Sequence, residues 1–279
     1  MDLYLVVKFK EKTMSAPVTP FAGGERSIQT GDSPNIDLVL IPAGEFWMGA
    51  LPQDKNAKKE EKPRHRVRIS RDFFVGKYPV TQKLYQLVMG SNLSHVKGDN
   101  LPVGNVSWIN AVTFCNKLSK REGKEAVYTI NGSTATCNWK AKGYRLLTEG
   151  EWKYAARGGE YHLYSGSDDV NAVAWEAKNS GRSPQPVGTK KPNGFGLYDM
   201  TGNVLEFCWD FYHPNAFSSR PAGEHAITTD PKGPEFGTNR VYCGGGWFYD
   251  AVNSRLSKRS GLAPTGKGAG TGFRIGLSR

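Results

Sequence analysis

Thiols are the side chains of this 279-residue chain best suited to covalent or metal chemistry, and their spacing argues against both. The four are Cys115, Cys137, Cys208 and Cys243. No two lie in a CxxC arrangement, so the sequence predicts neither a zinc site nor a local redox pair. Cys115 falls on an apolar helical stripe, and a disulfide among the other three stays open. The five histidines are scattered without any His-x-x-x-His pair: His65, His95, His162, His213 and His225.

The C-terminal segment has the residue types of molecular recognition instead. Its frame consists of residues 240–247 (RVYCGGGW), Arg255, Arg259, Pro264 and residues 272–274 (GFR). The filler between these positions has neither helical nor strand periodicity, so we expect it to form loops. Loops that are held by a rigid frame commonly carry function.

Two aromatic residues, Phe248 and Tyr249, open this filler. Such rings supply large rigid contact areas, and the Gly and Ser residues that follow let loops adapt, as in antibody paratopes. The alternative is that both rings simply fill the core. We favour exposure of both rings, because Trp247 already ends the strand-like run and the charged Asp250 directly follows Tyr249. Exposed aromatic rings beside polar residues mark an interaction patch, so the segment predicts a binding surface.

Local patterns predict the elements that must position this segment. Strands are expected at residues 36–41, 67–75, 241–242 and 273–277. Thr81 is a suitable N-cap for a helix through Met89, and a capping box formed by Thr148 and Glu151 begins another helix. A third helix is predicted by apolar residues at helical spacing, which are Trp108, Ala111, Val112, Cys115 and Leu118.

Composition indicates one folded unit. Hydrophobic residues make up 38% of the chain, and its 33 glycines and 16 prolines favour a loop-rich fold over a helical bundle. The sequence contains no run of 18 apolar residues, so it predicts no membrane span. We expect a single domain over residues 36–279 after a partly flexible lead-in over residues 1–35. The first apolar run is too short for an export signal, and no cysteine follows it as a lipid anchor.

The charge balance is strongly basic, with 37 Lys and Arg against 26 Asp and Glu, a formal net charge of +11. Much of the excess lies between Lys55 and Arg71, where Glu60 and Glu61 interrupt the basic run. Such runs usually form solvated faces, so nucleic-acid binding is not predicted. Attraction to an acidic cell surface or to acidic glycans is favoured.

Eight motifs in order resemble the formylglycine-generating-enzyme/sulfatase-modifying-factor family over about residues 36–279. They are the C-terminal frame and residues 41–49 (IPAGEFWMG), 61–67 (EKPRHRV), 79–81 (PVT), 102–108 (PVGNVSW), 144–158 (YRLLTEGEWKYAARG), 186–188 (PVG) and 194–206 (GFGLYDMTGNVLE). The resemblance implies an α+β, C-type-lectin-like fold of the formylglycine-generating-enzyme type, loop-rich with little regular secondary structure.

The family's oxidase activity does not transfer to this sequence. Catalytic members oxidise a substrate cysteine with two cysteines five residues apart, which align here with Tyr249 and Ser254. Neither residue can supply the reactive thiolate, and phenol and hydroxyl groups are poor ligands for Cu(I). Cys243 stands alone before the frame glycines. We therefore expect a non-catalytic relative with no required cofactor, and a formylglycine-type oxidase remains the alternative.

The C-terminal segment also resembles variable proteins of diversity-generating retroelements, of the treponemal type. Their variable region, here residues 243–274, changes where adenines of asparagine codons are replaced. The matching positions are Phe248, Tyr249, Asp250, Val252, Asn253, Lys258, Ser260, Gly261, Leu262, Ala263, Gly266, Gly268, Ala269 and Gly270. Lys258 fits less well, because a Lys codon also needs a changed third base.

The second resemblance implies a ligand-binding receptor at the cell surface or exported, whose ligand is a protein or glycan on another cell surface. A non-variable structural homologue is the alternative.

The first resemblance also implies a calcium site within residues 194–206. Family members bind calcium there, and the matching ligands are the side chains of Asp199 and Glu206 with the carbonyls of Gly202 and Val204. Two carboxylates and two carbonyls suit a hard cation. Alternatively, both carboxylates only cap the turn by hydrogen bonds.

Overall fold

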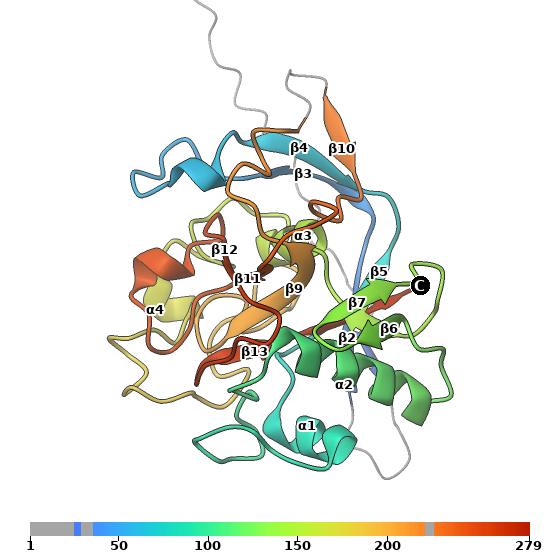
Figure 1. Cartoon of the computed structure of the whole chain (residues 1–279). Coiled ribbons are helices and arrows are strands. Elements are labelled where there is room, and N and C mark those ends of the chain that lie inside the picture. The colour runs from blue at the N-terminus through green and yellow to red at the C-terminus, as the bar shows by residue number, and fades with distance from the viewer. Residues whose placement is uncertain (1–24, 29–35, 221–225) are drawn as a thin grey trace, which may run out of the picture.

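The structure, a computed structural model, describes residues 25–28, 36–220 and 226–279. Within these ranges, short strands and helices are joined by long irregular segments (Figure 1). The C-terminal segment, coloured orange and red, crosses the centre of the molecule and reaches the side where α4 lies. This arrangement is the α+β, loop-rich architecture that the sequence predicted.

Three sheets and a hairpin make up the described strands. The first sheet has the order β1-β2-β5-β14-β8, with bounds Glu25–Ile28, Ile36–Ile41, Phe73–Gly76, Ile275–Ser278 and Tyr144–Leu146. The second has the order β10-β4-β3, with bounds Ile227–Thr229, His65–Ile69 and Gly44–Met48. The third has the order β12-β11-β9-β13, with bounds Ser260–Leu262, Arg240–Cys243, Leu205–Phe211 and Thr271–Phe273. The hairpin pairs β6 with β7, with bounds Tyr128–Asn131 and Thr134–Cys137.

The predicted helix signals are confirmed. Thr81 caps α1 (Gln82–Met89) through its side chain, and α3 (Glu149–Arg157) begins with the capping box of Thr148 and Glu151. The helix α2 (Trp108–Arg121) has its own capping box, which the sequence analysis missed, between Ser107 and Asn110. Three shorter helices complete the described set: η1 (Lys59–Glu61), α4 (Val170–Val173) and η2 (Ala251–Ser254).

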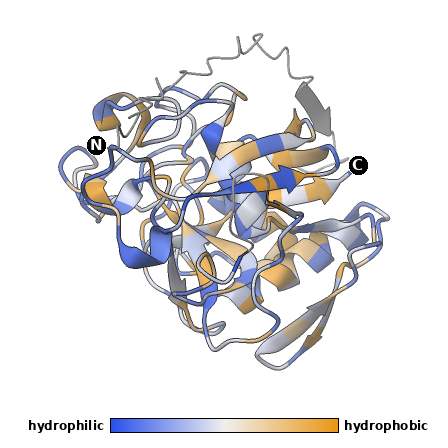
Figure 2. Ribbon diagram, turned by 90° about the horizontal axis from the view of Figure 1, so that it is seen from above, coloured by the Kyte–Doolittle hydropathy of each residue, from blue (hydrophilic) through white to orange (hydrophobic). Residues whose placement is uncertain are grey.

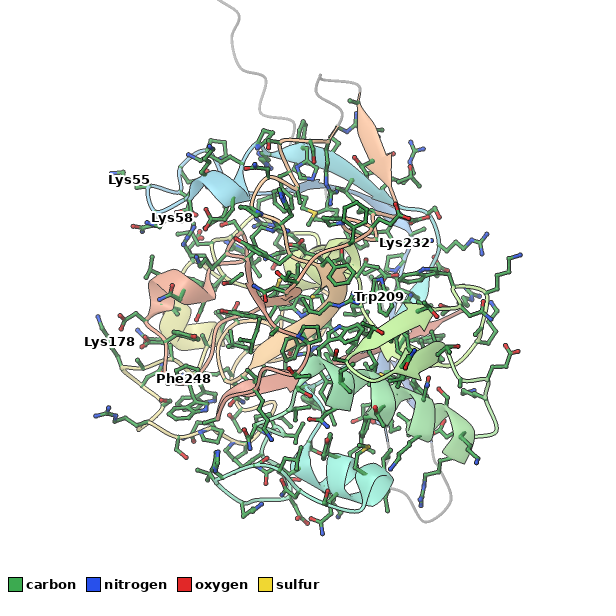
Figure 3. The ribbon with its side chains drawn as sticks, viewed as in Figure 1. Lys55, Lys58, Lys178, Trp209, Lys232 and Phe248 are labelled. Atoms are coloured by element: carbon green, nitrogen blue, oxygen red, sulfur yellow. The ribbon has the colours of Figure 1, made fainter. Side chains whose placement is uncertain are left out.

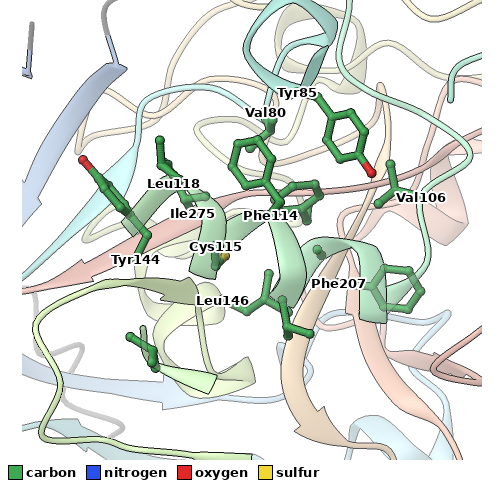
Figure 4. Packing of buried hydrophobic residues seen from close by; sticks show 14 of the residues in the cluster. Val80, Tyr85, Val106, Phe114, Cys115, Leu118, Tyr144, Leu146, Phe207 and Ile275 are labelled. Carbon is green, nitrogen blue, oxygen red and sulfur yellow. The ribbon is translucent and has the colours of Figure 1, made fainter. Parts of the chain in front are cut away.

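The apolar stripe of α2 packs into a hydrophobic core that also contains side chains of the first sheet (Figure 4). In this core the ring of Phe114 lies 5.6 Å from that of Tyr85 and 5.1 Å from that of Phe273, measured between centroids. Cys115 is fully buried among them, as expected for a core thiol. Because Phe273 ends β13, this core anchors the C-terminal end of the frame.

Two expected strands are each divided in the structure. Residues 67–75 form parts of β4 and β5, which belong to different sheets. Residues 273–277 likewise pass from β13 into β14, and Arg274 lies between the two strands. A period-two pattern does not show where a chain changes sheets, so the sequence predicted one strand in each place.

The expected lead-in over residues 1–35 needs one correction. Residues Glu25–Ile28 form β1, which pairs antiparallel with β2 and extends the first sheet. The rest of that prediction, residues 1–24 and 29–35, lies outside the described residues.

None of the described helices is both long enough and apolar enough to cross a membrane. The hydropathy colouring agrees, since hydrophobic and hydrophilic residues are interspersed along the elements (Figure 2).

Candidate ligand-binding site

The frame arginines are buried, and Arg255 is held in a cluster of charged groups. Its guanidinium donates to both carboxylate oxygens of Glu61, at 2.8 and 2.9 Å, and to the carboxylate of Asp54. Ser257 also donates to Glu61, at 2.7 Å. All four side chains are buried and come from two segments that are about 200 residues apart in sequence. This cluster therefore ties the C-terminal loops to the segment around η1.

Arg259 and Arg274, which also frame the loops, are likewise held in buried ion pairs. Arg259 pairs with Glu149 through two hydrogen bonds of 2.8 Å each. Arg274 contacts Glu206 at 2.9 Å and donates to the carbonyl oxygen of Gly76 at 2.7 Å. Buried bidentate pairs of this kind fix orientation as well as distance. Each loop of the filler thus begins or ends at an immobilised side chain.

The main chain of the filler is itself pinned by hydrogen bonds to the rest of the fold. The carbonyl oxygens of Pro264, Gly268 and Gly270 accept from the amides of Ile109, Asn105 and Leu205, at 3.2, 2.9 and 2.8 Å. Earlier in the filler, residues 260–262 form β12, which pairs with β11. Main-chain hydrogen bonds do not depend on which side chain a residue carries. These hydrogen bonds therefore fix the loop path without specifying the side chains along it.

The predicted variable positions are more exposed than the frame arginines, although Leu262 packs against the core. All of the predicted positions except Gly270 are partly or fully exposed, whereas Arg255, Arg259 and Arg274 are buried. Phe248 is 40% exposed (Figure 3), so the alternative that it fills the core is wrong. Its ring packs at 4.3 Å from that of Tyr249 and at 5.0 Å from that of Trp247.

These rings border a pocket of about 720 Å³, which we call the aromatic pocket. Predicted variable residues that line it are Phe248, Tyr249, Leu262, Gly268 and Ala269. An adjoining pocket of about 180 Å³ is lined by Tyr249, Asn253, Lys258 and Ser260. A volume between 300 and 1,000 Å³ is typical of ligand pockets. The structure therefore brings eight of the fourteen predicted positions together at two adjoining pockets.

Other predicted positions lie outside both pocket linings. Asp250 and Val252 are exposed at η2, and Ala263 and Gly266 are partly exposed after β12. Gly261 lies in β12 against other residues, since a Cβ there would meet the Cβ of Tyr212 at 2.6 Å.

The sequence analysis missed several residues that line the aromatic pocket: Ala177, Arg182, Leu205, Tyr242, Trp247, Lys267 and Thr271. Leu205 and Tyr242 come from β9 and β11, on which the loops rest. Arg182 lies in a loop outside the C-terminal segment, and its φ of 60° is unusual for a non-glycine residue. No local signal in the sequence connects residue 182 with residue 248, so only the tertiary structure could place them together.

Glycines among the predicted positions differ in the room around them. A Cβ at Gly268 would meet nothing within 4 Å, whereas at Gly270 it would lie 2.1 Å from Cε1 of Phe248. A Cβ at Gly266 would lie 2.7 Å from Cγ of Leu262. Gly268 can therefore be replaced freely, but residues 270 and 266 depend sterically on two other predicted variable positions.

The positions that align with the catalytic cysteine pair are unsuited to thiol chemistry. Tyr249 lies at the pockets, and Ser254 is fully buried with its Oγ facing the space beside Gly245. All four cysteines are free in the structure. Burial raises the pKa of Cys115 and of Cys208, and it raises the pKa of Cys137 to about 12. These three thiols are therefore protonated near neutral pH, when the thiolate is the reactive form.

The expected calcium ligands divide into two environments. Asp199 is buried, accepts hydrogen bonds from Gly188 at 2.7 Å and Asn203 at 3.3 Å, and burial raises its pKa to about 6. Glu206 is fully buried, and both of its oxygens are bound by the guanidinium of Arg274. The charge of the Glu206 carboxylate is thus compensated by an arginine within the protein.

In this arrangement Glu206 braces the frame through Arg274. Among the described residues, no group of three or more His, Cys, Asp or Glu side chains is placed to hold a metal ion. Calcium binding by the side chains of Asp199 and Glu206 with the carbonyls of Gly202 and Val204 stays a prediction.

Asp210, on β9, is buried, and it accepts no hydrogen bond from a cationic group among the described residues. It accepts from the main-chain amide of Glu149 at 2.8 Å, and its other oxygen has no hydrogen-bond partner among the described residues. Burial, followed by the nearby charge of Glu149, raises the pKa of Asp210 to about 7. In the unfolded chain the same carboxyl titrates near 3.8. The folded state therefore binds this proton more tightly, and its stabilising effect is lost as the pH rises from about 4 to 7.

We expect Asp210→Asn to stabilise the protein relative to wild type more at pH 8 than at pH 4. The gain should grow by roughly 2 to 4 kcal/mol between these pH values, because one pKa unit corresponds to about 1.4 kcal/mol. Urea unfolding of both proteins at both pH values measures it. A difference that does not change with pH would contradict the assignment.

Proteins of known sequence and structure are similar to this chain over most of its length. The family model for the sulfatase-modifying factor enzyme 1-like domain matches residues 25–278. Chaperone protein LppX of Paenibacillus barcinonensis is 34% identical, over 87% of this chain and 90% of that protein. The formylglycine-generating enzyme of Streptomyces coelicolor is 28% identical, over 85% of this chain and 87% of that protein.

Among solved structures, Treponema denticola variable protein 1 superposes with a TM-score of 0.80 and 30% identity. The match covers 91% of this chain and 99% of that one. It confirms the predicted resemblance to a treponemal variable protein and the predicted fold. Together with the family model, it shows that this chain belongs to the sulfatase-modifying factor enzyme 1-like, formylglycine-generating-enzyme family.

Proposed function

We propose that this protein is a non-catalytic, ligand-binding receptor whose C-terminal loop residues are diversified by a retroelement. The observation that carries the proposal is the separation of two sets of residues. The frame residues Arg255, Arg259 and Arg274 are buried in ion pairs, whereas thirteen of the fourteen predicted variable positions are at least partly exposed. The similarity to Treponema denticola variable protein 1 supports it.

A diversified site needs a loop path that survives changes of side chain. The filler meets this need because its path is set by main-chain hydrogen bonds and by ion pairs of the frame. The ligand is proposed to be a protein or glycan on another cell surface, bound by the aromatic pocket. Surface display or export of this protein is part of the same proposal.

An oxidase of the formylglycine type is disfavoured by its missing thiols. Residues 249 and 254 are Tyr and Ser, and Cys243 is buried on β11 without a second cysteine in the segment that follows. A two-cysteine mechanism has no reactive pair at the aromatic pocket.

A second candidate is a chaperone that binds a fixed partner polypeptide. It is favoured by the 34% identity to Chaperone protein LppX and by the exposed rings of the aromatic pocket, which could contact an apolar segment. The two candidates differ in whether the pocket residues vary between copies of the gene.

Sequencing the 3′ end of the gene and its neighbourhood across many isolates tests the proposal. We expect changes confined to the predicted variable positions, matching adenines in a nearby template repeat, with a reverse-transcriptase gene alongside. We also expect a residue other than glycine at position 270 only where position 248 carries a smaller side chain, since the two compete for space. A uniform C-terminus without a template would instead leave a static homologue or a chaperone.

A further inference from the structure

A second groove, of about 430 Å³, lies between the ends of β4, β5, β8 and β14 and the segments at residues 139–142 and 230–232. We call it the basic groove. Its cationic lining residues are Arg71, Lys140, Lys142, Arg145, Lys232 and Arg279. It shares no lining residue with the aromatic pocket. Lys232 and Phe248, which mark the two sites, lie on opposite sides of the molecule in Figure 3.

The carboxylates that line the basic groove are already bound within the protein. Asp72 accepts from Arg279 at 2.5 Å and from the main-chain amide of Ala43 at 2.9 Å. Asp230 accepts from the main-chain amide of Ser70 at 2.8 Å and from its hydroxyl group.

Glu151, the third lining carboxylate, binds Arg145 through two hydrogen bonds of 2.7 Å each. Asp72 and Glu151 are thus paired with cations, whereas Asp230 is bound only by the neutral donors of Ser70 and keeps its charge.

Of the other four cations, Lys142 donates to the main-chain oxygen of Arg279 at 2.5 Å. Arg71, Lys140 and Lys232 have no salt-bridge partner among the described residues. All three are exposed. The ammonium group of Lys232 lies 4.6 Å from the ring centroid of Trp139, and Trp139 in turn packs edge-on against Trp209 at 5.8 Å. A cation–π contact holds the ammonium group near the ring while its N–H donors stay available. Lys232 is thus positioned in the groove without being neutralised.

We propose that the basic groove binds an anionic polysaccharide, through its sulfate or carboxylate groups. A groove lined by six cationic side chains and only three carboxylates has an excess of positive charge, which attracts anions and concentrates them. Single-stranded nucleic acid is disfavoured because it needs successive aromatic platforms. The aromatic residues that line the groove are Trp139, which is half-buried, and Phe73, which is buried. The cations come from separate segments around the rim, which suits binding to spaced anionic groups.

This site would give the protein a constant affinity for an acidic surface, because none of the predicted variable positions lines it. A constant site and a variable site on different sides could act together. The basic groove is independent of the proposed diversification, so either proposal can fail alone.

The test uses isothermal titration with a size-defined heparin oligosaccharide at 0.15 M salt, with a neutral dextran of equal length as the blank. We expect Lys140→Gln plus Lys232→Gln to weaken heparin binding at least tenfold. The matched control, Lys55→Gln plus Lys58→Gln, removes the same charge from exposed residues elsewhere (Figure 3) and should change the affinity less than threefold. Phe248→Ala plus Tyr249→Ala should leave heparin binding unchanged.

Equal losses in the groove variant and its control would overturn the proposal, because binding would then follow net charge alone. Tighter groove-dependent binding of a poly-glutamate peptide of equal charge would overturn it in favour of an acidic polypeptide. Lys232→Arg tests the anchored cation separately and should keep heparin affinity within threefold. Melting temperatures confirm that each variant is folded.

Discussion

Replacing Arg255 by methionine is expected to lower the free energy of unfolding by about 3 to 5 kcal/mol. The substitution removes the cation that neutralises Asp54 and Glu61, whose side chains are 2% and 0% exposed. Two carboxylates would then remain buried together without a partner. Removing one side of a buried ion pair costs far more than the pair itself contributes, because the remaining charge has lost its hydration.

Urea unfolding at neutral pH measures this change, and Arg66→Met is the matched control. Arg66 also pairs with a carboxylate, that of Glu45, but both side chains are 32% exposed. We expect the control to lose less than about 1 kcal/mol. Adding Asp54→Asn and Glu61→Gln to Arg255→Met should restore part of the lost stability, since the buried charges disappear. A loss below 1 kcal/mol in Arg255→Met would show that the cluster does not hold the loops.

Replacing both Phe248 and Tyr249 by alanine should have the largest effect on ligand binding. The affinity is expected to fall by roughly 30-fold or more, because truncating even one hot-spot aromatic residue at an interface centre costs about 2 kcal/mol or more and such losses are not additive. The melting temperature should stay within a few degrees of wild type, since Phe248 is 40% exposed and the frame is untouched.

Calorimetric titration with a peptide selected against the wild-type protein from a displayed library measures the affinity. The matched control is Trp47→Ala plus Tyr161→Ala, two exposed aromatic residues at 37% and 43% that lie outside the pocket linings. Unchanged affinity in the Phe248 and Tyr249 variant would remove the aromatic pocket from consideration. A large loss of stability would instead show that both rings support the loop conformation.

The sequence by itself determined the elements whose signals are local. Thr81 and the capping box of Thr148 and Glu151 predicted where α1 and α3 begin, and apolar spacing predicted the buried face of α2. Such signals lie within a few residues of one another, so a short window contains them. The motifs, in their order along the chain, predicted the family and its fold. The aperiodic filler between the frame residues predicted the exposed loops.

Only the tertiary structure decided which distant groups meet. It paired Arg255 with Asp54 and Glu61 and paired Glu206 with Arg274. It brought Arg182 and Phe248 into the lining of one pocket. It also divided residues 67–75 and 273–277 between sheets. The physical reason is that a buried charge must find a compensating partner wherever the packed chain brings one, and no local pattern specifies that partner.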